Sequence, residues 1–304
     1  MIRVAMFDLG LTLIDAQQRP FKHVREALTA IAGFKTADAK ALRICLVSDF
    51  TLAPPPGNAK QVRALFEQYL GVLDATGLRP FFEPVQRRVT LSTHAGALKP
   101  DRAVFETALR RLRLDAGLDE CLLITENAAH IKAARNKLHM QALQFRAAGA
   151  GSFDFDDWSQ APALVAHLLG PRHEANTHAA IKVHLAAKGF EVSSLERAGA
   201  TGAFKASGQM WCPVAVPGDA DARAVHVAVP AQGQVTQGPH GALRSRLQRP
   251  ADAHIAEAAA FVASLAAHGQ IASRGAPDAA DATHEIEVDA QGRRRLVRKR
   301  FSAL

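Results

Sequence analysis

Four polar residues stand where an apolar segment ends or a helix begins, and their types suit the transfer of a phosphoryl group: Asp8, Ser48, Lys99 and Glu126. A carboxylate can attack phosphorus and form an aspartyl-phosphate, while a hydroxyl can hold the phosphate oxygens. A lysine can neutralise the phosphate charge, and a second acid can help to hold Mg²⁺. These residue types predict a Mg²⁺-dependent site for phosphoester chemistry, provided that the fold brings them together.

The sequence between these residues predicts such a fold. Short apolar segments with the length of buried strands occur at residues 2–7, 41–47, 89–91, 121–125 and 140–145. Segments between them carry apolar side chains at helical spacing. Strands that alternate with helices predict an α/β fold, with a five-stranded parallel sheet covered by helices on both faces. The carboxyl ends of parallel strands share one sheet edge, where we expect the four polar residues to converge.

The order of these short motifs resembles the haloacid dehalogenase-like (HAD) hydrolase superfamily. Residues 8–13 (Asp-Leu-Gly-Leu-Thr-Leu) stand in the place of the first motif, and Ser48 in that of the second. Lys99-Pro100 resembles the third motif with its following helix, and Glu126-Asn127 stands where the acidic fourth motif belongs. The resemblance covers residues 1–170 and implies a HAD-like Rossmannoid domain.

The resemblance also implies a role for each residue. Asp8 would be the nucleophile and Lys99 the cation that bridges the nucleophile and the phosphate, so both are predicted catalytic residues. Ser48 would bind a phosphate oxygen, and we expect Asp49 and Lys99 to face the substrate as well. The predicted substrate is a phosphorylated small molecule or a macromolecular phosphoester.

The predicted cofactor is Mg²⁺, held by the side chains of Asp8 and Glu126 and by the backbone carbonyl of Gly10. In most phosphatases of the family, the residue at position 10 is an aspartate that also serves as the general acid and base. Gly10 can supply only the carbonyl, and positioned acid–base help is typically worth about 10²–10⁴ in rate. Leu11 replaces a residue that is usually small, and His130 stands near the place of a further acid. Branches without the acid include dehalogenase and phosphonatase types, and Asp15, Asp49 or a water could replace it.

Two hypotheses about function follow from these departures. The first is a slow HAD-like hydrolase that forms an aspartyl-phosphate on Asp8. The second is a catalytically inactive HAD fold that serves as a binding or assembly protein. The short intervals between the first three motifs leave no room for the family's usual cap insertions, so a capless site is expected. In the family, an open site of this kind is associated with macromolecular substrates, or with another domain that covers the site in place of the cap.

A domain boundary is predicted at Gly170-Pro171, where the alternation of strands and helices stops. Residues 171–304 are expected to form a smaller α+β domain. Its predicted elements are a helix at 174–188, strands near 190–197, 209–216 and 223–229, a long loop, a second helix around 255–266, and a hairpin that pairs 285–288 with 296–301. This domain could shape or cover the crevice of the first.

Charge and composition limit the partners. The formal net charge is +8, and Arg293–Arg300 carries six cations within eight residues. A solvated edge strand is the favoured interpretation of that segment, and contact with nucleic acid is the alternative. No apolar segment is long enough to span a bilayer, so no membrane partner is expected. The three distant cysteines and the absence of a signal-peptide pattern predict a cytoplasmic location.

Overall fold

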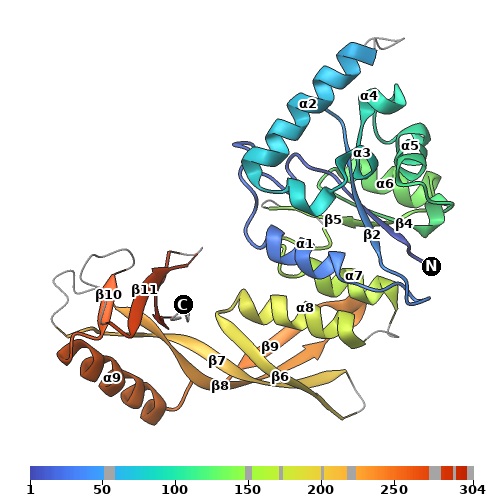
Figure 1. The fold of residues 1–304 in the computed structure, drawn as a ribbon. Coiled ribbons are helices and arrows are strands. Elements are labelled where there is room, and N and C mark those ends of the chain that lie inside the picture. Colours follow the sequence, from blue (N-terminus) through green and yellow to red (C-terminus); the bar gives the residue numbers. More distant parts are fainter. Residues whose placement is uncertain are drawn as a thin grey trace. The chain divides into compact units, whose positions relative to one another are not determined.

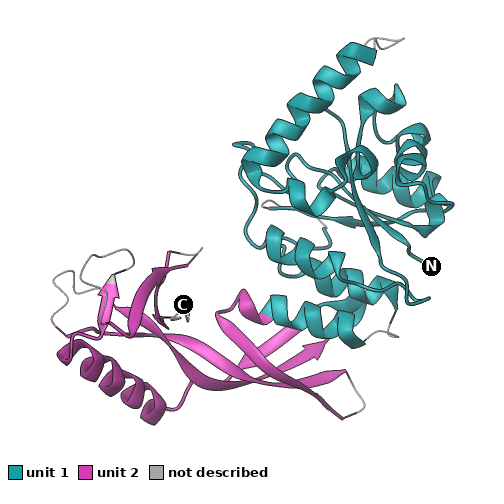
Figure 2. Cartoon of the chain, in the orientation of Figure 1, with its two compact units in different colours: residues 1–184, 238–243 teal, residues 185–237, 244–304 magenta. Residues whose placement is uncertain are grey.

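The computed structural model describes residues 1–50, 59–147, 153–170, 174–199, 202–217, 224–273, 282–289 and 292–299. The chain forms two compact units: Met1–His184 with Gly238–Leu243, and Leu185–Gln237 with Arg244–Leu304 (Figure 2). Helix α8 (Glu174–Ala186) therefore belongs to the first unit as far as His184. The predicted domain boundary at residues 170–171 stays a prediction, and each unit is described by itself.

The first unit is built on a five-stranded parallel sheet of order β3-β2-β1-β4-β5 (Figure 1). Its strands are β1 (Val4–Phe7), β2 (Arg43–Ser48), β3 (Val89–Leu91), β4 (Cys121–Thr125) and β5 (Gln141–Gln144). The three strands at 4–7, 89–91 and 121–125 are buried at every position, as expected of parallel strands that are covered on both faces. The structure confirms the predicted five-stranded parallel sheet.

Helices cover both faces of this sheet, as predicted. One face packs against α1 (Val24–Ala32), α2 (Ala59–Thr76) and α7 (Ala161–Leu169), and the other against α5 (Arg102–Leu112) and α6 (Ala128–Lys137) (Figure 1). Four short helices connect the main elements: η1 (Arg79–Phe82), α3 (Val85–Arg88), α4 (Ser92–Ala95) and η2 (Leu118–Glu120). Along β1, Ala5 and Phe7 face the first group of helices while Val4 and Met6 face the second, because successive side chains of a strand point to opposite faces. None of the helices in the described ranges has the length and apolar composition needed to cross a membrane.

Trp158 connects the loop after β1 to the hydrophobic core. Its side chain is fully buried and its ring packs against those of Phe7, Phe145 and Phe155 at centroid distances of 6.2, 5.6 and 5.2 Å. The indole Nε1–H donates a 2.9 Å hydrogen bond to the carbonyl oxygen of Thr12. A buried indole N–H needs such an acceptor, so this contact fixes the loop at the end of β1.

The second unit contains a seven-stranded sheet of order β10-β11-β12-β8-β7-β6, with β9 paired to β8. Its elements are β6 (Phe190–Ala198), β7 (Ala203–Val214), β8 (Val225–Gln237), β9 (Leu243–Leu247), α9 (Asp252–Ala267), β10 (Ile271–Ser273), β11 (His284–Val288) and β12 (Arg294–Arg298). The short helix η3 (Pro239–Gly241), between β8 and β9, belongs to the first unit. The smaller α+β arrangement and the pairing of β11 with β12 were expected. The long loop predicted after residue 229 is wrong, because β8 continues to Gln237 and β9 follows. The Gly, Gln and Pro residues there have low strand propensity, and the cross-strand partners supply the missing stabilisation.

The basic segment forms an interior strand, which contradicts the predicted edge strand. β12 pairs with β11 on one side and with β8 on the other. Arg295 forms an ion pair with Glu191 at 2.7 Å, and its guanidinium lies 3.5 Å from the centre of the Trp211 ring. Arg293 pairs with Asp289 at 2.8 Å. Much of the charge is therefore engaged within the unit, whereas the last arginine of the segment lies outside the described residues.

Candidate active site

Asp8 directly follows β1, at the carboxyl edge of the sheet. Its backbone N–H donates to the carbonyl oxygen of Ile124 at 3.0 Å, so its main chain is still held by the neighbouring strand β4. The residue is only 7% exposed. Its Oδ1 accepts a hydrogen bond from the backbone N–H of Leu9 at 2.9 Å and a longer one from Ser48 Oγ, at the end of β2, at 3.4 Å. These donors hold the carboxylate in one orientation.

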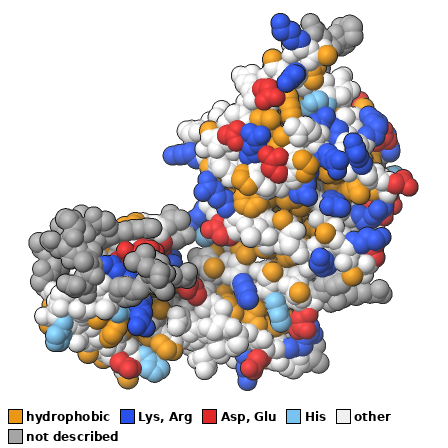
Figure 3. Space-filling view, viewed as in Figure 1, with side chains coloured by type: hydrophobic (Ala, Val, Ile, Leu, Met, Phe, Trp, Pro, Cys, Tyr) orange, Lys and Arg blue, Asp and Glu red, His pale blue; other side chains and the backbone are white. Residues whose placement is uncertain are grey.

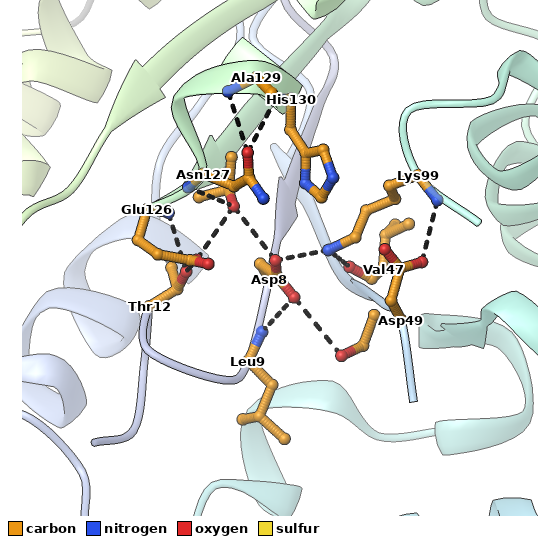
Figure 4. A network of polar contacts seen from close by, with 12 residues as sticks. Asp8, Leu9, Thr12, Val47, Asp49, Lys99, Glu126, Asn127, Ala129 and His130 are labelled. Atoms are coloured by element: carbon orange, nitrogen blue, oxygen red, sulfur yellow. Dashed lines mark hydrogen bonds and ion pairs between the residues drawn. The ribbon is translucent and has the colours of Figure 1, made fainter. Parts of the chain in front are cut away.

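Lys99 is the cation of the site. Its Nζ lies 2.5 Å from Asp8 Oδ2 and donates to the carbonyl oxygen of Val47 at 3.1 Å (Figure 4). The Lys99 side chain is 1% exposed and that of Asp8 10% exposed, so the ion pair is buried. The backbone N–H of Lys99 donates to Asp49 Oδ1 at 2.9 Å. Asp49 therefore positions the main chain of Lys99, and one of its two oxygens is engaged in doing so.

Thr125 joins the two carboxylates of the site. Its Oγ1 lies 3.1 Å from Asp8 Oδ2 and 3.2 Å from Glu126 Oε2, and its single proton can be donated to one of them at a time. Thr12 holds Glu126 from the other side: its Oγ1 donates to Glu126 Oε2 at 2.5 Å and accepts from the Glu126 backbone N–H at 3.1 Å (Figure 4). The two acids thus lie one hydroxyl group apart.

This donor set fits Mg²⁺. The ion is usually held in proteins by one or two carboxylates, with substrate oxygens and waters completing its octahedral shell. Asp8 and Glu126 supply two neighbouring carboxylates, and Gly10 lies in the exposed turn that follows Asp8. Within the described ranges no three His, Cys, Asp or Glu side chains are grouped as metal ligands. A Mg²⁺ ion here would therefore depend on the Gly10 carbonyl, the substrate and water for its remaining ligands.

Gly10 and Leu11 differ in how much their backbone and surroundings restrict the side chain. A Cβ atom built on Gly10 would meet no atom within 4 Å, and the φ of Gly10 lies outside the left-handed region. Leu11 does adopt the left-handed conformation, with φ 56°, and the residue is 51% exposed. Such a backbone costs a residue other than glycine roughly 1–2 kcal/mol. Position 11 thus has the backbone that favours a small residue, while position 10 has space for a side chain.

His130 lies beside the site but is uncharged. Asn127 caps α6 by accepting the backbone N–H groups of Ala129 and His130 at 2.9 and 3.2 Å, which places His130 in the first turn (Figure 4). Burial, and then the charge of Lys99, lower the pKa of His130, against the opposing effect of nearby acids. Its Nδ1 is buried and has no hydrogen-bond partner among the described residues. The ring is therefore neutral near pH 7 and supplies no anionic ligand.

The contacts of Asp15 make it a poor general acid. Its carboxylate accepts from the backbone N–H groups of Gln17 and Arg19, both at 2.9 Å, and forms an exposed ion pair with the Arg19 guanidinium. The Arg19 backbone hydrogen bond is the largest of the effects that lower the pKa of Asp15. A carboxyl group stabilised as its anion is a poor proton donor. Asp15 is thus not suited to replace the acid missing at position 10.

The sequence predictions placed Asp8, Ser48, Lys99 and Glu126 in one crevice, and the structure brings these residues together. They missed the two threonines that hold the acids, Thr12 and Thr125, although Thr12 lies in the first motif and Thr125 directly precedes Glu126. The presence of a threonine near Asp8 and another next to Glu126 was the only sequence signal for these contacts. The sequence pattern does not show which acceptor a threonine hydroxyl contacts in the fold.

The buried ion pair predicts a large effect of Lys99→Met on stability. Removing one partner of a buried pair leaves a buried charge and costs about 3–5 kcal/mol. We expect this loss in the urea transition of the first unit at pH 7, followed by Trp158 fluorescence in a Trp211→Phe background. The matched control is Lys40→Met, because Lys40 pairs with Asp38 while its side chain is 74% exposed. Equal losses for the two variants would contradict a buried Asp8–Lys99 pair.

The comparisons with known proteins give distant structural likenesses. No protein-family model matches the chain, and no curated protein matches its sequence. The chain is similar to the HAD-hydrolase YfnB from Bacillus subtilis in a magnesium-bound crystal form, with 13% identity over 51% of this chain and 57% of that chain and a TM-score of 0.35. It is also similar to a HAD-like family hydrolase from Porphyromonas gingivalis, with 16% identity over 57% of this chain and 100% of that chain and a TM-score of 0.29. The match spans little more than half of YfnB, and the chemistry of this chain must be judged from its own side chains.

Proposed function

We propose that the first unit is a HAD-like phosphohydrolase that acts through Asp8 with Mg²⁺ as cofactor. The observation that supports this proposal most is the buried Asp8 carboxylate at the sheet edge, 2.5 Å from Lys99 Nζ and one hydroxyl group from Glu126. Such a cluster of opposite charges with converging hydroxyls is expensive to bury for structure alone. It suits a reaction in which a dianionic group must be held and attacked.

The proposed reaction has two displacements at phosphorus. An oxygen of the Asp8 carboxylate forms a bond to phosphorus while the bond to the ester oxygen breaks, and the leaving oxygen takes a proton from water because position 10 has no acid. Water then attacks the phosphorus of the aspartyl-phosphate, loses its proton to solvent, and releases inorganic phosphate with the carboxylate restored. Lys99 offsets the phosphoryl charge throughout, and Ser48 Oγ donates to a phosphoryl oxygen. Mg²⁺, held by Asp8, Glu126 and the Gly10 carbonyl, would supply electrostatic stabilisation of the transferred group.

The proposed substrates are phosphorylated small molecules or macromolecular phosphoesters at an open, capless site. Between β1 and β2 the described residues contain α1 as their only helix, and between β2 and β3 they contain α2, η1 and α3. The few helices between these strands support a site without an inserted cap domain. We also place the protein in the cytoplasm, since none of its cysteines forms a disulfide and two of the three are buried.

The proposal is tested by assaying the purified protein against a panel of phosphoesters with Mg²⁺ and with a chelator. We expect slow release of phosphate that requires Mg²⁺. The competing candidate is a catalytically inactive HAD fold used for binding or assembly, which is favoured by the absence of an acid at position 10. An absence of Mg²⁺-dependent turnover on every phosphoester, with no Mg²⁺-dependent binding of a phosphate mimic such as beryllofluoride, would decide for that candidate.

A further inference from the structure

A second pocket of the first unit contains a cation, an aromatic ring and a buried hydroxyl. It has a volume of about 580 Å³ and lies among α2, α4 and the end of α5. Pockets of this volume are large enough to hold a small organic molecule. The lining residues that bear on binding are Arg63, Phe66, Thr93, His94 and Arg111. Lys and Arg side chains gather over α5 on this face of the molecule (Figure 3).

Arg111 is a partly buried cation that pairs with no acidic side chain among the described residues. Its Nε–H donates to the carbonyl oxygen of Val89 at 3.1 Å, and its guanidinium carbon lies 5.7 Å from the centre of the Phe66 ring. Burial lowers the pKa of Arg111. Glu67 also lines the pocket, but it is exposed, and the exposed Arg63 of the same helix is a second cation in the lining. A partly buried cation without an acidic partner is only partly solvated, and an anionic ligand would offset that cost.

Thr93 supplies an unpaired donor in the same pocket. The residue is 8% exposed, and its Oγ1 is buried without a hydrogen-bond partner in the part of the chain that the structure describes. His94 Nδ1 accepts the backbone N–H of Leu91 at 2.9 Å, so the ring proton resides on Nε2. Burial, and then the charge of Arg111, lower the pKa of His94 to about 4, and the ring acts as a neutral donor. It packs edge-on against Phe66, with ring centres 5.1 Å apart.

This pocket is distinct from the Asp8 site. Leu91, at the end of β3, pairs in register with Ser48 at the end of β2, so the pocket begins at the same sheet edge. Strand β3 is two strands from β1, which at the usual strand spacing corresponds to roughly 10 Å. The two sites share no lining residue. A ligand can therefore bind here without contact with the Asp8 carboxylate.

We propose that this pocket binds a small organic anion whose carboxylate or phosphate group is attached to a flat apolar body. The anionic group contacts Arg111, and the Thr93 hydroxyl, which is enclosed in the ligand-free chain, reaches it by rotation about χ1. The apolar body lies against Phe66 and Val62. This binding does not depend on the phosphohydrolase chemistry of Asp8.

The test is a calorimetric titration of the full chain without Mg²⁺, using benzoate, phenylphosphonate and benzyl alcohol as probes. We expect at least one of the two anions to bind and the neutral alcohol not to bind. Binding by benzoate alone identifies a carboxylate ligand, and binding by phenylphosphonate alone identifies a phosphate-like one. No binding of either anion at millimolar concentration, or equal binding of the alcohol, overturns the proposal.

Variants of the lining residues assign the binding to this pocket. Arg111→Met should weaken the affinity at least tenfold, whereas Arg110→Met, an exposed neighbour on α5 outside the pocket, should leave it unchanged. Thr93→Val should also weaken it several-fold without lowering stability, since it removes a buried hydroxyl that has no partner. Asp8→Asn should bind as the wild type does. Unchanged affinity in both Arg111→Met and Thr93→Val, or loss in Asp8→Asn alone, would place the ligand elsewhere and overturn the proposal.

Discussion

Asp8→Asn is expected to remove phosphoester turnover almost completely, with a loss in kcat on the order of 10⁴–10⁶, as is typical when a nucleophile is deleted. The asparagine amide is nearly isosteric with the carboxylate, and its oxygen can still accept the Leu9 backbone N–H. It cannot form an acyl phosphate, and it no longer neutralises Lys99. The measurement is the rate of Mg²⁺-dependent phosphate release from the best substrate of the panel, together with the loss of beryllofluoride binding.

Asp15→Asn is the matched control for this experiment. Asp15 lies on the same loop, but its carboxylate is engaged by the backbone of Gln17 and by Arg19. We expect its kcat to remain near that of the wild type. If Asp8→Asn retained wild-type activity, the turnover would come from another site and the proposed nucleophile would be wrong. If only the Asp15→Asn substitution abolished phosphoester turnover, Asp15 would have a role that its contacts do not suggest.

Gly10→Asp is expected to increase kcat by about 10²–10⁴, the usual contribution of a positioned general acid and base. A side chain fits at this position, because a Cβ on Gly10 meets no atom within 4 Å and the backbone does not require a positive φ. The acid would protonate the leaving oxygen and later take the proton of the attacking water. The pH profile of kcat should gain a new ionisation that the wild type lacks.

Gly10→Asn separates acid catalysis from a change in shape. The amide has the size of the carboxyl group but neither donates nor accepts a proton at neutral pH. We expect no gain for this variant, and little change in stability for either substitution since Gly10 is exposed. Equal rates for the Asp and Asn variants would show that the missing acid does not limit the reaction. An increase that both shared would point to an effect of side-chain volume on the turn.

Much of the first unit could be predicted from local sequence. The strand at 89–91 and the strand at 121–125 are found at the predicted residues, and the ends of the others differ by at most two residues. Strands buried on both faces appear as continuous apolar segments, and the polar residues after them mark the sheet edge. The second unit was less predictable, because its long strands contain glycine, glutamine and proline, as β8 shows where buried and exposed residues alternate. There the stabilisation comes from cross-strand partners that local sequence does not specify.

The local sequence marks the reactive residues: an acid after each of two strands, a hydroxyl at the end of a third and a lysine before a helix. How these residues meet depends on the tertiary fold. The strand order β3-β2-β1-β4-β5 places β1 between β2 and β4, and this brings Ser48 and Thr125 to opposite oxygens of Asp8. The same order places the pocket of Arg111 two strands away from Asp8. In the second unit, β12 is an interior strand and not the expected edge strand because it also pairs with β8. Burial patterns follow from hydrophobicity along the chain, whereas the distance between two polar groups depends on which strands become neighbours.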